Sequence, residues 1–168
     1  MAVTSTMKVG RSTESKANRR WKVKTEAKEV IIRKLRAEDF GDIIELDKRV
    51  VGKDRASSWP QRVASHFKTY EPLLSHVAEA EGKIVGFIIG DIRGSEYALP
   101  LGGWVDIEGV DPAYQRQGIG RKLIEAFERE CRRYGVKTRI MVQENDERIL
   151  KFVRSLGFRR GQLIDFEK

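Results

Sequence analysis

The feature that most constrains this chain is a glycine-rich turn between an apolar strand and an amphipathic helix. It spans residues 110–121, with the sequence VDPAYQRQGIGR. Gly118 and Gly120 let the backbone turn sharply and approach a ligand without a side chain in the way. The helix that follows starts with amide N–H groups that lack a partner within the helix, at the positive end of its dipole. With Arg116 and Arg121 alongside, the turn predicts an anion site suited to a diphosphate.

The spacing of this turn excludes two common nucleotide-binding motifs. A dinucleotide fold has the pattern Gly-x-Gly-x-x-Gly, but the third glycine position is Leu123 here. A P-loop ends in Gly-Lys-Ser/Thr, whereas Gly120 is followed by Arg-Lys-Leu, with no hydroxyl group to hold magnesium. The pattern that remains is Gln-x-x-Gly-x-Gly.

Hydrophobic periodicity predicts an α+β domain with a mixed, mostly antiparallel central sheet and helices on both faces. The expected strands are 30–35, 74–81, 84–92, 103–110, 138–142 and 163–166. The expected helices are 37–51, 57–67, 119–134 and 146–156, the last capped by Asn145. Residues 1–28 form a basic N-terminal extension that carries +6 of the net charge of +8, and we expect it to be solvated. The folded domain is expected to cover residues 29–168.

Two motifs in this order give the chain a family resemblance. Gln115, Gly118 and Gly120 match the signature of the GNAT superfamily of acyl-CoA-dependent N-acetyltransferases, and residues 145–158, with Asn145 and a terminal Ser-Leu-Gly-Phe, resemble its second CoA-side motif. The resemblance implies acetyl-CoA as co-substrate, with its pantetheine arm beside the strand 104–110. The residues that it implies for binding acetyl-CoA are Val110, Gln115, Arg116, Gln117, Gly118, Ile119, Gly120, Arg121 and Asn145.

Two carboxylates on this strand are candidates for catalysis. An amine must lose a proton before it attacks a thioester, and a carboxylate can take that proton directly or through water. Period-two alternation predicts that Trp104, Asp106, Glu108 and Val110 share one face of the strand. Asp106 is the first candidate, because it lies further from the glycine turn and nearer the expected acyl end of the ligand. Glu108 is the second.

The chain departs from the resembled family at two places. The tyrosine with which many members protonate the leaving thiolate corresponds to Val153, so Tyr70, Tyr97, Tyr114 or a water would have to replace it, or the thiolate leaves unassisted. Only residues 159–168 follow the second motif, which leaves room for a single strand on the acceptor side. Because Leu163, Ile164 and Phe166 are apolar, we expect a two-fold dimer in which these ends or the N-terminal tails cover each other's acceptor side; an open-clefted monomer is the alternative.

Composition limits the remaining functions. No run of about 18 apolar residues exists, so no membrane partner is expected, and a single cysteine, Cys131, fits core packing in a cytoplasmic protein. No Cys/His cluster exists, so no metal is expected. The expected function is acetyl transfer to a primary amine of a small molecule, a peptide N-terminus or a protein lysine; nucleic acid is not an expected partner. The alternative is a non-catalytic acyl-CoA-binding or protein-interaction module.

Overall fold

The structure is a computed structural model that describes residues 29–51, 74–94 and 98–164. A five-stranded sheet runs in the order β1-β2-β3-β4-β5, formed by Val30–Lys34, His76–Ala80, Lys83–Arg93, Gly102–Val110 and Lys137–Ile140. The first four strands pair antiparallel and β5 joins β4 in parallel. The mixed, mostly antiparallel sheet expected from the sequence is confirmed.

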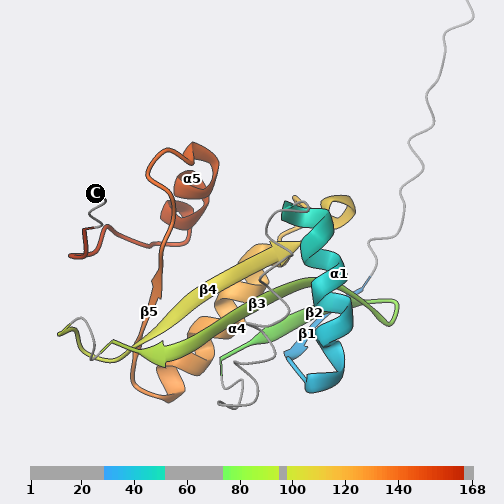
Figure 1. Ribbon diagram of the computed structural model, residues 1–168, viewed down its shortest axis with the longest axis horizontal. Coiled ribbons are helices and arrows are strands. Elements are labelled where there is room, and N and C mark those ends of the chain that lie inside the picture. The colour runs from blue at the N-terminus through green and yellow to red at the C-terminus, as the bar shows by residue number, and fades with distance from the viewer. Residues whose placement is uncertain (1–28, 52–73, 95–97, 165–168) are drawn as a thin grey trace, which may run out of the picture.

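Helices cover both faces of this sheet, as predicted (Figure 1). On one face lies α1 (Phe40–Val51), preceded by the single turn η1 (Ala37–Asp39); on the other lies α4 (Ile119–Arg133). The turn η3 (Pro112–Tyr114) links β4 to α4, and α5 (Glu147–Ser155) follows β5 beyond the end of the sheet. Each face has its own apolar core, with Phe87 fully buried on the α1 side and Phe127 fully buried on the α4 side.

Two expectations at the C-terminal end are wrong. Asp146, not Asn145, caps α5, because its carboxylate accepts a hydrogen bond from the Ile149 amide at 2.9 Å. The predicted last strand, 163–166, is not formed: Leu163 and Ile164 belong to no strand and are exposed, and residues 165–166 lie outside the described residues. The predicted helix 57–67 and the basic extension also lie outside them. Association of two copies through the C-terminal ends or the N-terminal tails stays a prediction.

A line of small residues lets α4 approach the sheet closely. A Cβ added to Gly86 would come within 3.2 Å of Ile119 and Leu123, and one added to Gly103 within 2.2 Å of the Cys131 sulfur. Cys131 is therefore a core residue, as predicted. At Gly90, a Cβ would lie 2.0 Å from the Trp104 carbonyl oxygen and 2.7 Å from the Phe127 ring. Because the first of these neighbours is backbone, it cannot move aside as a side chain can.

Replacement of Gly90 by alanine should therefore destabilise the fold. We expect Gly90→Ala to lower the free energy of unfolding by more than about 2 kcal/mol, as overpacking of a rigid core does. Gly41→Ala is the matched control, since no atom lies within 4 Å of its added Cβ in α1 and alanine favours a helix by up to about 1 kcal/mol. Urea unfolding followed by circular dichroism measures both changes. Equal midpoints for the two variants would contradict the close packing of α4.

Candidate active site

The glycine turn presents exposed backbone at the start of α4. Gly118 is the N-cap, at φ +80°, a left-handed conformation that favours glycine, and it has no side chain to occupy the first amides of the helix. Residues 115–118 are all exposed, and Arg116 also has a positive φ of +63°. The turn therefore offers an accessible helix N-terminus of the kind that binds phosphate groups.

Side chains on both sides hold this turn in place. Asp111 caps η3 by accepting a hydrogen bond from the Ala113 amide at 2.9 Å, and it also pairs with Arg49 of α1 at 3.1 Å. The Gln115 side chain donates a hydrogen bond of 3.0 Å to the carbonyl of Val110, which ends β4. These contacts explain the position of Gln115 in the motif: it ties the turn to the strand before it.

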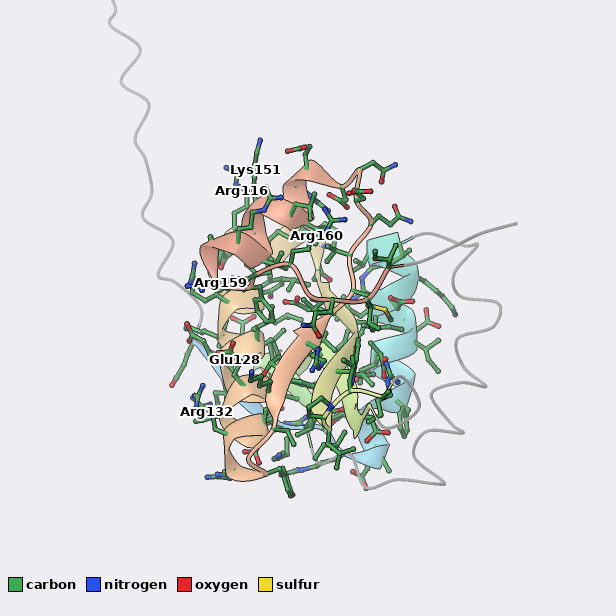
Figure 2. All side chains as sticks on the ribbon, turned by 90° about the vertical axis from the view of Figure 1, so that its left-hand side faces the viewer. Arg116, Glu128, Arg132, Lys151, Arg159 and Arg160 are labelled. Atoms are coloured by element: carbon green, nitrogen blue, oxygen red, sulfur yellow. The ribbon has the colours of Figure 1, made fainter. Side chains whose placement is uncertain are left out.

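Basic side chains surround the turn. Arg121, in the first turn of α4, donates a hydrogen bond of 3.4 Å to Ser155 at the end of α5. Arg116 lies at the same end of the molecule as Lys151 of α5, and both side chains are exposed (Figure 2). Arg132, also labelled there, lies further along α4 and pairs with Glu128 at 3.8 Å. The charge nearest the turn is therefore positive.

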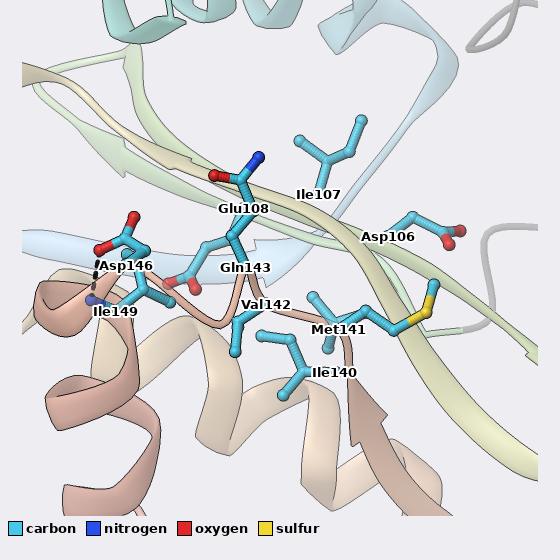
Figure 3. Close-up of a pocket in the computed structure, with 10 residues that line it drawn as sticks. Asp106, Ile107, Glu108, Ile140, Met141, Val142, Gln143, Asp146 and Ile149 are labelled. Carbon is cyan, nitrogen blue, oxygen red and sulfur yellow. Dashed lines mark hydrogen bonds between the residues drawn. The ribbon is translucent and has the colours of Figure 1, made fainter. Parts of the chain in front are cut away.

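A gap opens between β4 and β5 beside the turn. The two strands pair only between 102–105 and 137–140, after which β4 continues to Val110 while the chain after Ile140 leaves the sheet toward α5. A cavity of about 240 Å³ fills this gap (Figure 3). It is lined by Val105, Asp106, Ile107, Glu108, Ile140, Met141, Val142, Gln143, Asp146 and Ile149.

The predicted shared face of the two carboxylates is wrong. Ile89 pairs with Ile107 but the next residue, Gly90, pairs with Val105, so Asp106 is an extra residue in β4. Such a bulge interrupts the alternation of side chains. Trp104 and Asp106 lie with Arg93 on one side, whereas Glu108 and Val110 face α4 on the other.

Asp106 lies at the bulge, at the edge of the gap. Its side chain is 26% exposed, and its carboxylate forms an ion pair with both terminal nitrogens of Arg93. Arg93 in turn stacks on Trp104, with 5.7 Å between the guanidinium carbon and the ring centroid. In Figure 3 Asp106 points away from the residues of the α5 side. This arrangement puts a carboxylate that is paired with arginine, and partly open to solvent, next to the cavity.

Glu108 lies deeper in the gap, close to the start of α4. A Cβ built on Gly120 would be only 2.8 Å from a Glu108 carboxylate oxygen and 3.5 Å from the ring of Phe152. Burial raises the pKa of Glu108 to about 8. A carboxyl group with this pKa is mostly protonated at neutral pH, so Glu108 is a hydrogen-bond donor there.

Several other predicted residues do not line the cavity. Asn145 precedes the helix cap and is exposed, and Ile119 is buried in the core under the turn. Val153, at the position where the resemblance implies a tyrosine, is buried. Tyr114 packs at the edge of the α4-side core, while Tyr70 and Tyr97 lie outside the described residues.

Arg93 and Arg139, which both stack on Trp104, were not predicted as site residues. The bulge, which puts Trp104 on their side of the sheet, leaves no clear mark in the sequence.

Within the described residues no group of His, Cys, Asp and Glu side chains could hold a metal ion. His76 is buried, and its ring nitrogen lies 2.9 Å from the Leu74 carbonyl; burial lowers the pKa of this imidazole. None of the helices in that part of the chain is long and apolar enough to cross a membrane.

Comparison with known proteins now identifies the family. The model of the acetyltransferase (GNAT) family matches residues 30–158, which include the whole sheet, the glycine turn and α5. The chain therefore belongs to this family. It is an acyl-CoA-dependent N-acetyltransferase that uses acetyl-CoA as co-substrate and an amine as acceptor.

Solved structures have the same fold. A CoA complex of the aminoglycoside N-acetyltransferase AAC(6')-Iy superposes with a TM-score of 0.71 at 17% identity, covering 85% of this chain and 96% of the other. The ribosomal-protein-S18-alanine N-acetyltransferase from Escherichia coli superposes with a TM-score of 0.66 at 24% identity, covering 80% of both chains. An aminoglycoside acetyltransferase from an uncultured soil metagenomic sample, in complex with trehalose, superposes with a TM-score of 0.67 at 24% identity, covering 83% of this chain and 95% of the other. A search of curated protein sequences finds no match.

The burial of Glu108 makes stability depend on pH in a defined direction. Its pKa is about 8 when folded and about 4.5 ordinarily, so the folded state binds the proton more tightly and stability falls as pH rises through this interval. Glu108→Gln removes the ionisable group. We expect the variant to melt several degrees above the wild type at pH 8.5 and close to it at pH 5.

Thermal unfolding at a series of pH values measures this difference. Glu125→Gln, at an exposed position of α4, is the control that loses the same charge without the burial. A difference in melting temperature between Glu108→Gln and the wild type that stays constant from pH 5 to 8.5 would contradict the buried carboxyl.

Proposed function

We propose that this enzyme transfers the acetyl group by direct attack of a primary amine on acetyl-CoA bound in the gap between β4 and β5. The observation that carries the proposal is the early end of the β4–β5 pairing at Val105 and Ile140. Beyond it, β4 has a partner on the β3 side only. The backbone of residues 106–110 can therefore hydrogen-bond the amide groups of a pantetheine arm, as a neighbouring strand would.

The exposed turn at the start of α4 is the proposed diphosphate site. Free amides, the helix dipole and the guanidinium groups of Arg116 and Arg121 all favour a multiply charged anion there. The residues proposed to bind acetyl-CoA remain those implied by the family resemblance. Within this set, Gln115 acts by holding the turn and Ile119 by anchoring it in the core.

The length of the strand favours Asp106 over Glu108 as the base. A strand rises by about 3.3 Å per residue, so Glu108 is roughly 7 Å and Asp106 roughly 13 Å along β4 from Val110, which adjoins the turn. A pantetheine arm contains two amide linkages, so it extends past Glu108 before its sulfur is reached. The thioester is then placed next to Asp106, where β4 and β5 separate.

In the proposed reaction Asp106 is the general base. It takes a proton from the ammonium form of the acceptor, directly or through a water, and the neutral amine attacks the thioester carbon. The new C–N bond forms, the nitrogen that has attacked loses its second proton to solvent water, the tetrahedral intermediate collapses and the C–S bond breaks. CoA leaves as a thiolate, for which a pKa near 8.5 is low enough without a tyrosine donor at position 153.

Glu108 has a different proposed role. Its protonated carboxyl group lies beside the path of the arm, where it can donate a hydrogen bond to an amide carbonyl of the pantetheine. A carboxylate there would instead repel the diphosphate. Glutamine keeps a donor at this position, so Glu108→Gln is a conservative change for binding.

The two carboxylates are distinguished by their neutral variants. Asp106→Asn should lower kcat roughly 10²-fold or more, the range of general acid–base catalysis, with a nearly unchanged KM for acetyl-CoA. Glu108→Gln should keep kcat within a few-fold. Steady-state kinetics with saturating amine, followed through release of free CoA thiol, measures both. The opposite ranking would make Glu108 the base and contradict the placement of the thioester.

Two variants of Gly118 that differ in charge but not in size test the diphosphate site. Gly118→Asp and Gly118→Asn put side chains of equal size into open space, because no atom lies within 4 Å of an added Cβ, and both residues tolerate a positive φ better than most. We expect acetyl-CoA to bind the Asp variant at least tenfold more weakly than the Asn variant in calorimetric titration, since the carboxylate opposes the diphosphate. Equal affinities would place the diphosphate elsewhere.

A further inference from the structure

Arg139 of β5 is held in a fixed position at the edge of the gap. Its guanidinium carbon lies 5.5 Å from the centroid of the Trp104 ring, on the strand next to it in register. Its side chain passes over Gly102, where a Cβ would come within 2.8 Å of Nε. The absence of a side chain at position 102 therefore lets Arg139 lie flat against the sheet and the indole.

The guanidinium of Arg139 lacks an anionic partner among the described residues. Its Nε is buried and has no hydrogen-bond acceptor, and no carboxylate in the described ranges forms an ion pair with it. Asp106 pairs with Arg93, and Asp91, which pairs with Trp104 across the sheet, accepts a hydrogen bond of 2.6 Å from the Ile92 amide. Lys137, two residues before Arg139 on the same face of β5, adds further positive charge.

An arginine that is stacked and immobilised in this way is well suited to bind a carboxylate. The planar fork of a guanidinium matches two carboxylate oxygens, and stacking on an aromatic ring reduces the side-chain entropy lost on binding. The guanidinium is half-buried with no acceptor at its buried Nε, so a carboxylate that pairs with the accessible part of the group offsets the cost of burying its charge.

This charge lies on the side of the sheet from which the acceptor would approach Asp106. Arg139 is level with Trp104, two residues before Asp106, and Trp104 and Asp106 both contact Arg93 on that face. Met141, the residue directly after β5, lines the cavity and is 69% exposed. An amine bound at Asp106 would thus have the cation of Arg139 and the apolar side chain of Met141 nearby.

We propose that the acceptor is a primary amine that also carries a carboxylate, and that Arg139 binds this carboxylate while the amine meets Asp106. This proposal rests on the proposed function, because it takes Asp106 as the end of the gap where the amine reacts. A carboxylate gains from Arg139 and Lys137, whereas an acceptor with several ammonium groups, such as an aminoglycoside, is repelled by them. The acceptor therefore differs in charge from the one named for AAC(6')-Iy.

Two sources can supply this chemistry. One is a free amino acid, whose carboxylate is two bonds from the amine. The other is a peptide N-terminus followed by an acidic residue, whose carboxylate is several bonds further away. The experiment therefore includes both: free alanine against alaninamide, which lacks the carboxylate, and short C-terminally amidated peptides that begin Ala-Glu or Ala-Gln and are otherwise identical.

Binding of each acceptor to the protein saturated with CoA is measured by calorimetry, and acetylation with acetyl-CoA by mass spectrometry. In the wild type we expect at least one carboxylate acceptor to bind about tenfold more tightly than its amide counterpart. Arg139→Gln should abolish that preference, and Arg139→Lys should keep only part of it, because the ammonium lacks the planar fork. Arg129→Gln, which removes the same charge from an exposed position of α4 on the opposite face, should keep it in full.

The outcomes separate this proposal from the proposed function. If neither acceptor pair shows a preference in the wild type, or if the preference survives in Arg139→Gln, carboxylate recognition by Arg139 is wrong. If the preference is present and depends on Arg139 but Asp106→Asn acetylates as fast as the wild type, the binding site stands and the assigned base fails. A preference only for alanine over alaninamide identifies a free amino acid, and a preference only for the Ala-Glu peptide identifies a peptide N-terminus.

Discussion

The close contact between α4 and the sheet fixes most of the geometry in this enzyme. Gly86, Gly90 and Gly103 leave no side chain between the strands and the helix, so Ile119, Phe127 and Cys131 pack directly on them. This contact sets the N-terminus of α4 at the end of β4, where exposed amides can bind an anion. As a result, β4 leads from the point where β5 separates to this turn.

The bulge at Asp106 puts the side chains before and after it on opposite faces of β4. Before it, Trp104 lies with Arg93 and Arg139 on the acceptor face; after it, Glu108 faces α4 and the expected path of the arm. A regular strand would put both carboxylates on one face, where their charges would repel each other. With the bulge, one carboxylate is neutralised by Arg93 and the other holds a proton at neutral pH.

The parts of the fold with strong local signals could be predicted from the sequence. The apolar stripe of α4, its glycine turn and the hairpin at Gly82 are all visible as periodicity and turn residues, and the structure confirms them. The cap of α5 was misplaced by one residue, because Asn145 and Asp146 are both good caps and only tertiary geometry chooses between them. The bulge was not predictable, because no glycine or proline marks it and it depends on the pairing of β4 with β3. The stacking of Arg139 on Trp104 depends on the pairing of β4 with β5, which brings together residues 35 positions apart in the sequence.

The central claim is that acetyl-CoA lies along β4, with its diphosphate at Gly118 and its thioester at Asp106. A crystal structure of the protein with a non-hydrolysable acetyl-CoA analogue tests this most directly. We expect the diphosphate oxygens on the first amides of α4, the arm amides on the backbone of residues 106–110, and the acyl carbonyl within one water of the Asp106 carboxylate. An acyl group that lies beside Glu108, or a diphosphate away from the first turn of α4, would contradict this account.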